Sequence, residues 1–169
     1  MILRSIGIIH FVHSPILIVL PFFINNREYD IIYINYFFLI MFLYTFINGE
    51  CPISYVCKII QNRNYIAGDD ITYYPEIEYI FKYPQHIQYF FGITTTAYLA
   101  TLTRVIFRAN IPVFLIYPPM LLLGLYFAAF RSNFRNKYRR LFLRFQQITR
   151  YTIFITILGI GIYCVVNVY

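Results

Sequence analysis

The stretch YTIFITILGIGIYCVVNV, residues 151–168, decides the fold. It runs without a single acidic or basic side chain. An α-helix needs about 20 mostly apolar residues to cross the ~30 Å hydrocarbon core of a bilayer. We therefore predict a transmembrane helix here.

Four further segments have a similar character. The whole sequence is 60% hydrophobic and only 12% charged, whereas soluble domains carry about 25% charged residues. The fold class that we predict is all-α, a polytopic transmembrane helix bundle of about five spans forming one integral membrane domain over residues 1–169. The spans are expected at residues 5–24, 31–47, 87–107, 111–130 and 151–168, with interfacial segments at 49–86 and 131–150.

Prolines interrupt two of these spans. Pro15 and Pro21 are expected to kink the first, since proline removes a backbone hydrogen bond. Pro118 and Pro119 are expected to bend or break the fourth. A chain with three or four spans and a re-entrant segment at these two prolines is the alternative.

The basic residues predict an orientation. Five spans place the N-terminus and the segments 48–86 and 131–150 on one side, with eleven Lys and Arg residues, against Arg27, Arg104 and Arg108 on the other. Cytoplasmic segments carry the excess of positive charge. We therefore expect a multi-pass protein with its N-terminus on the cytoplasmic side or its equivalent.

The segment RSNFRNKYRRLFLRFQQITR, residues 131–150, is basic and amphipathic. We expect a helix that lies in the headgroup layer or continues into the last span. Its cations are expected to bind anionic lipid headgroups. Nucleic acid is the rival partner, less favoured because the run directly precedes a span. The residues concerned are Arg131, Arg135, Lys137, Arg139, Arg140, Arg144 and Arg150.

Two histidines stand in the first span. His10 and His13 are three residues apart and share a helix face. Ionisable residues inside a membrane are rare and are candidates for function. The pair could hold a metal or haem, or it could hold the helix against its neighbours. We favour the structural role and expect no cofactor.

The segment NGECPISYVCKII, residues 48–60, follows the second span. Asn48-Gly49 is a helix stop, and Pro52 is suited to begin a new helix. The topology brings Glu50 and Cys51 to the membrane face where the first span begins. Glu50, Cys51, His10 and His13 are therefore a candidate metal site. No sequence motif of a known catalytic site is present, so we assign no catalytic residue.

The same residues carry a resemblance. A histidine in the first span followed by NGECPISY and YIAGDD resembles small uncharacterised membrane proteins of large DNA viruses. The chain is also similar, over residues 10–75, to a bacterial family of small membrane proteins with Cys-Pro-Leu-Thr-x-x-Glu after the second helix. Cys51, Pro52, Ile53 and Ser54 match this motif, while Cys57 stands where the family has glutamate. The resemblance implies a membrane hairpin and no particular activity.

Three functions are compatible with these features. We favour a non-enzymatic structural or accessory protein that packs with other proteins in a membrane assembly, such as a virus particle or an organellar complex. The frequent Phe, Tyr and Ile suggest an A+T-rich genome of that kind. The first alternative is a small membrane enzyme or a metal or haem redox protein using His10, His13, Glu50 and Cys51. The second is a transporter.

Overall fold

The described part of the chain is mainly helical. The structure is a computed structural model that describes every residue except 1, 72, 82, 132–136 and 169. Within the described residues it forms six helices, so the prediction of an all-α protein is confirmed. They are α1 (Ile2–Phe23), α2 (Arg27–Phe46), α3 (Pro52–Gln61), α4 (Pro84–Ala109), α5 (Val113–Arg131) and α7 (Arg139–Val168).

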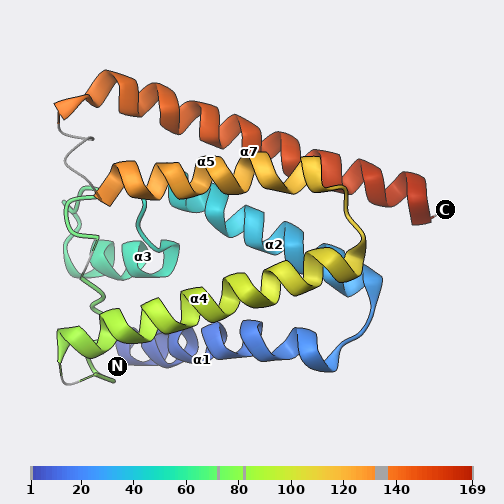
Figure 1. The fold of residues 1–169 in the computed structure, drawn as a ribbon. Helices are drawn as coiled ribbons and strands as arrows, with labels where there is room; N and C mark the ends of the chain where they lie inside the picture. Colours follow the sequence, from blue (N-terminus) through green and yellow to red (C-terminus); the bar gives the residue numbers. More distant parts are fainter. Residues whose placement is uncertain (1, 72, 82, 132–136, 169) are drawn as a thin grey trace.

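The five long helices lie side by side in one bundle, each running opposite to the long helix before it (Figure 1). The start of α1, all of α3, the last residues of α5 and the first residues of α7 gather at one end, which we call the α3 end. The C-terminal part of α7 lies at the opposite end. Helix α2 packs against α3, α4 and α7, α4 also packs against α1, and α5 packs against α7.

Four helices, α1, α2, α4 and α7, are long and apolar enough to cross a membrane. Helix α5 has a shorter apolar stretch, Val113–Ala129, and its 19 residues extend about 28 Å at about 1.5 Å per residue. The outward faces are apolar, as a lipid solvent requires. On α1, for example, the exposed side chains include Ile8, Ile9, Val12, Ile16 and Val19.

The helix boundaries differ from the predicted spans by a few residues throughout, and two of the differences matter for the fold. Helix α5 continues through Pro118 and Pro119 without a break. The last helix begins at Arg139 rather than at residue 151. The basic segment therefore continues directly into the last span, which was one of the two expected arrangements. The periodic pattern runs on in phase, because Phe142, Gln146 and Thr149 face inward along the same stripe as Ile153.

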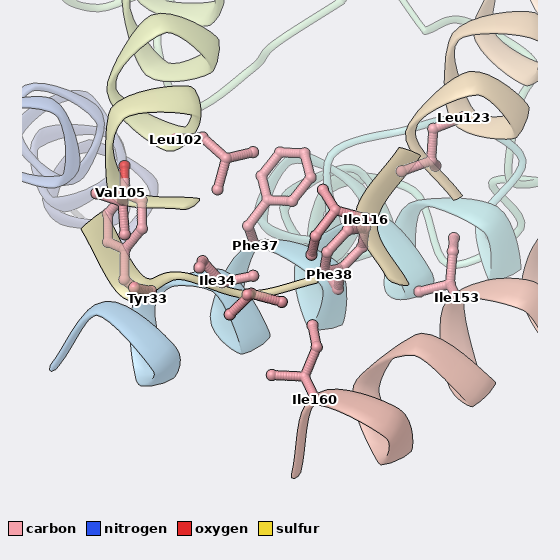
Figure 2. Close-up of a cluster of buried hydrophobic side chains, with 12 residues drawn as sticks. Tyr33, Ile34, Phe37, Phe38, Leu102, Val105, Ile116, Leu123, Ile153 and Ile160 are labelled. Carbon is pink, nitrogen blue, oxygen red and sulfur yellow. The ribbon is translucent and has the colours of Figure 1, made fainter. Parts of the chain in front are cut away.

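The apolar core is centred on α2. Tyr33, Ile34, Phe37 and Phe38 are almost fully buried and project toward α4, α5 and α7 (Figure 2). Leu102 and Val105 of α4, Ile116 and Leu123 of α5, and Ile153 and Ile160 of α7 complete the core. Helix α2 thus contributes more buried side chains to this core than any other helix.

An ion pair joins three helices at the end opposite α3. Arg108 of α4 donates from Nε to Oδ2 of Asp30 in α2 at 2.7 Å, and its Nη2 also bonds Oδ1. The same guanidinium donates to the carbonyls of Pro21 at 3.0 Å and Ile24 at 2.9 Å. The last carbonyls of a helix lack partners within the helix. Arg108 therefore caps α1 while Asp30 neutralises its charge.

Four threonine hydroxyls of α4 are satisfied within the helix. Thr94, Thr96, Thr101 and Thr103 each donate to the carbonyl four residues earlier, at 2.8–3.0 Å. A hydroxyl bonded in this way costs little in an apolar surrounding. The threonines are therefore compatible with a span at this position.

Candidate active site

The turn after α2 places a thiol at the start of a helix. Asn48 and Gly49 adopt positive φ angles of 52° and 80°, which asparagine tolerates better than most residues and glycine adopts freely. The chain reverses there, and Cys51 becomes the N-cap of α3, with Pro52 as its first helical residue. Proline suits that place because its φ is helical and its missing N–H is not needed.

Cys51 is the first member of a chain of three functional groups. Its Sγ lies 3.4 Å from Nε2 of His10 in α1. The other ring nitrogen of His10, Nδ1, lies 2.9 Å from Oε1 of Glu76. Ser54 donates its hydroxyl to the same Oε1 at 2.5 Å. His10, Ser54 and Glu76 are buried, and Cys51 is half-buried.

Gly7 makes this geometry possible. A Cβ atom at Gly7 would lie 1.7 Å from the backbone oxygen of Glu76, far inside any van der Waals contact. The segment that carries Glu76 therefore rests directly on the backbone of α1. Since His10 lies three residues further along α1, on the same face, the contact at Gly7 brings the carboxylate to the imidazole.

The electrostatics of the site favour a thiolate. Burial of the Cys51 thiol opposes ionisation, but His10, the backbone of Ser54 and the Tyr44 hydroxyl favour the charged form, so the pKa of Cys51 falls below its usual value. Burial also opposes ionisation of Glu76, yet the hydrogen bonds from His10 and Ser54 keep its pKa below the ordinary range. A thiol at a helix N-terminus beside a histidine is the usual setting of a reactive cysteine.

The first turn of α3 offers donors beside the thiol. The amide of Tyr55 bonds the carbonyl of Cys51 at 2.9 Å, which closes the first helical turn. The amide of Ser54 already favours the Cys51 thiolate, and the amide of Ile53 belongs to the group that has no acceptor within a helix. Such amides can stabilise an oxygen that becomes negative near the thiol.

A second buried network holds the segment that follows α3. Nζ of Lys58 lies 3.2 Å from Oε1 of Glu50 and 3.3 Å from the Tyr65 hydroxyl, and it also bonds the carbonyl of Asp70. Tyr65 donates to Glu50 as well, and its pKa is raised by burial and by that hydrogen bond. The network fixes the chain on its way to Glu76.

The structure places the four residues of the predicted metal site in different surroundings. His10 and Cys51 lie together, but Glu50 faces Lys58, and Nε2 of His13 lies 2.7 Å from the hydroxyl of Tyr36. No group of three or more His, Cys, Asp or Glu side chains among the described residues is arranged to hold a metal ion. Cys51 and Glu76 contact the two different ring nitrogens of His10, and this geometry is that of a proton relay.

The predicted lipid-binding cations lie near the α3 end. Arg139, Arg140 and Arg144 of α7 are exposed, and Nζ of Lys137 lies 5.3 Å from the ring centre of Tyr138. Arg150 is half-buried and bonds the carbonyl of Thr45 in α2. Arg135 lies outside the described residues, as does the side chain of Arg131.

Sequence reasoning missed Glu76 and Ser54. Glu76 stands in YYPEIEYIFKYP, residues 73–84, which the aromatic side chains mark as an interfacial segment. Its signal is a carboxylate in a chain that has only seven acidic residues. Ser54 stands out in the sequence only as part of a motif, and its hydroxyl can be assigned only once Glu76 is known to lie beside it.

The comparisons with known proteins give no relative. No family model matches the chain, no curated protein is similar to it, and no solved structure shares its fold at a significant level. The resemblance through CPIS stays a prediction. The function of the protein is therefore inferred from the geometry of this chain.

Proposed function

We propose that this protein is a membrane-embedded thiol enzyme that transfers an acyl group through Cys51. The observation that carries the proposal is the continuous chain from the thiol of Cys51 through His10 to the carboxylate of Glu76. A nucleophile within reach of a base, with the base oriented by a third group, is the arrangement of covalent acyl-transfer catalysis.

Each residue has one role in this reaction. Glu76 accepts a hydrogen bond from Nδ1–H of His10, which leaves the lone pair of Nε2 directed at the thiol. His10 takes the thiol proton, and the resulting thiolate of Cys51 attacks the carbonyl carbon of an ester or thioester. The C–S bond forms, the bond to the leaving group breaks, and His10 returns the proton to that leaving group. Water or an acceptor alcohol or amine then releases the acyl group by the reverse sequence.

Ser54 supports this assignment, because it fixes the oxygen that orients the base. Its hydroxyl and Nδ1 of His10 both reach Oε1 of Glu76. Oε2 of Glu76 is buried and has no hydrogen-bond partner among the described residues. A buried group left without a partner is uncommon and calls for a reason. The role of the Glu76 carboxylate in orienting His10 is such a reason.

The proposal includes a topology of five spans with the α3 end on the cytoplasmic side or its equivalent. Helix α5 lies alongside α7 in the bundle (Figure 1), and the exposed arginines of α7 lie near the α3 end, in keeping with the positive-inside rule. The site then lies near one membrane surface, beside the exposed apolar side chains of Val56 and Ile60 on α3.

The decisive experiment is the pH dependence of alkylation of Cys51 by iodoacetamide in detergent micelles, followed by intact-mass spectrometry. The background is Cys57→Ser with Cys164→Ser, so that only Cys51 reacts. We expect half-maximal alkylation below the pH of an ordinary thiol, whose pKa is about 8.5. In His10→Gln the midpoint should move above that of the parent. His13→Gln is the matched control and should leave the midpoint in place.

Activity is measured with p-nitrophenyl esters of short and long acyl chains. We expect Cys51→Ser to lose the hydrolysis and His10→Gln to lower its rate about 10²- to 10⁴-fold, the usual contribution of a general base. An ordinary alkylation midpoint, unchanged in His10→Gln, would contradict the proposal. If a membrane assembly that contains this protein keeps its function when Cys51→Ala is introduced, the result would instead support the accessory role expected from the sequence.

A further inference from the structure

A hollow of about 230 Å³ lies between α2 and α7, away from the residues of the thiol site. Phe42 and Phe46 of α2 line one wall. The other wall consists of residues of α7, namely Gln147, Arg150, Tyr151 and Phe154. The walls are aromatic surfaces, and the ring centres of Phe42 and Phe46 are 4.9 Å apart and those of Phe42 and Phe154 are 6.2 Å apart.

The guanidinium of Arg150 is held at this hollow. Its Cζ lies 4.3 Å from the centre of the Phe46 ring, and its Nε and Nη2 both donate to the carbonyl of Thr45. These two bonds use one edge of the guanidinium. Nη1 has no hydrogen-bond partner among the residues that the structure describes, and a planar guanidinium is well suited to a phosphate oxygen.

The charges of the chain leave this part of α7 without an acidic partner. All seven acidic residues precede position 79, and Asp30, Glu50 and Glu76 are paired with Arg108, Lys58 and His10. The sequence of α7 contains no acidic residue but carries four arginines. None of the ion pairs among the described residues involves α7, so this surface is open to an anion from outside the chain.

The polar and apolar residues of the hollow are separated along its length, as the headgroup and the acyl chains of a lipid are. Gln147, Arg150 and Phe46 lie toward the α3 end, while Phe42 and Phe154 lie about one helical turn further into the bundle on their own helices. The cation therefore stands at the shallow end and the apolar rings at the deep end. A water-soluble phosphate or a nucleic acid would leave the apolar rings without a partner.

We infer that this hollow binds one anionic phospholipid, with its phosphate on Arg150 and an acyl chain against Phe42 and Phe154. The inference is independent of the thiol site, because Cys51, His10 and Glu76 are not among the residues that line the hollow. The sequence predicts only that the basic segment is attracted to an anionic membrane surface. The inference here assigns a single lipid-binding position on the bundle.

The absence of tryptophan from the sequence allows a direct test. Tyr151→Trp places one indole at the rim of the hollow, at a side chain that is 68% exposed. The variant is reconstituted in phosphatidylcholine vesicles, and its fluorescence is quenched with phosphatidylglycerol or phosphatidylcholine carrying brominated acyl chains. We expect quenching by the anionic lipid with an association constant about fivefold higher, the effect of one cation near the surface.

Two reporters and two substitutions make the test specific. Ile162→Trp, on the same helix and deeper in the bilayer, should show no preference between the two lipids. Adding Arg150→Gln to Tyr151→Trp should abolish the preference, whereas adding Arg144→Gln, which removes an exposed cation of the same helix, should preserve it. Soluble glycerol phosphate should not reverse the quenching.

Three results would overturn the inference. The first is equal quenching by both lipids at Tyr151→Trp, and the second is the same preference at Ile162→Trp. The third is an equal loss of preference in Arg144→Gln and Arg150→Gln, which would indicate a diffuse surface charge. Because Arg150 also bonds Thr45, circular dichroism must confirm that Arg150→Gln folds. If it does not fold, the comparison of the two reporters decides alone.

Discussion

Gly7 is the residue on which the thiol site depends most directly. It makes no hydrogen bond through a side chain and carries no charge, yet its missing Cβ lets the backbone of Glu76 rest on α1. The site thus uses a glycine for its lack of volume rather than for flexibility, because Gly7 lies in the regular helix α1.

Replacement of Gly7 by alanine is expected to damage both stability and reactivity. The new Cβ would meet a backbone oxygen, so the segment carrying Glu76 must move away from His10. We expect a lower thermal midpoint in detergent and an alkylation midpoint of Cys51 shifted to higher pH. Gly92→Ala is the control, since nothing lies within 4 Å of the position that its new Cβ would take. That change should be neutral or stabilise by about 0.5–1 kcal/mol.

Glu76 is expected to stabilise the folded protein by an amount that is lost in acid. Its pKa is lower in the folded chain than its ordinary value, because the hydrogen bonds from His10 and Ser54 outweigh burial. The stabilisation is therefore complete above the ordinary glutamate pKa of about 4.3 and is lost as the pH falls through the lower folded value. Thermal midpoints of the parent and of Glu76→Gln should converge between pH 5 and pH 3, taken as a rough window. A constant difference would argue against an ionised Glu76.

Cysteine chemistry at the residue scale should be selective. Cys57 is fully buried on the inner face of α3, and burial raises the pKa of its thiol to about 11. Cys51 is only half-buried and is a free thiol. Alkylation of the parent protein at neutral pH should therefore modify Cys51 before Cys57, as peptide mass spectrometry would show.

At the scale of elements, side chains of α7 cap the C-terminal end of α2. Nε2 of Gln146 donates to the carbonyl of Thr45 at 2.7 Å and also lies 3.2 Å from both Oδ1 of Asn48 and the hydroxyl of Tyr126. Arg150 bonds the same carbonyl of Thr45. The end of α2 is thus held by a neighbouring helix, and this fixes the turn that leads to Cys51.

Gln146→Leu is expected to lower the free energy of unfolding by about 1–3 kcal/mol, because it removes three hydrogen bonds from buried groups. Gln147→Leu, at the next and exposed position, should change stability by less than about 0.5 kcal/mol. Denaturant titrations in mixed micelles can compare the two. Equal effects would mean that Gln146 acts only through the polarity of α7.

The sequence predicts elements better than contacts. Long apolar runs locate the spans because every backbone polar group in lipid must be satisfied within its own helix. The topology also places His10 and Cys51 at one membrane face. Glu76 and the pair of Asp30 with Arg108 could not be foreseen, since no helical period relates residues so far apart in the chain. The apolar pattern places the start of α7 too late because arginine ends an apolar run without ending a helix.

For the whole molecule, the five-span topology predicts which loops share a side. In a background without native cysteines, Asn25→Cys, Asn64→Cys and Lys137→Cys report on three connections at exposed positions. A membrane-impermeant maleimide added to sealed vesicles should label the second and third from one side and the first from the other. Labelling of Lys137→Cys together with Asn25→Cys would show that α5 does not cross.

The unbroken length of α7 has a mechanical consequence. Its 30 residues extend about 45 Å, well beyond a hydrocarbon core of about 30 Å. A rod of this length responds to a thinner or thicker bilayer by changing its tilt. Because Gln146 ties α7 to the end of α2, tilting of α7 pulls on the turn before Cys51. We therefore expect a change in membrane thickness to alter the position of the thiol through α7.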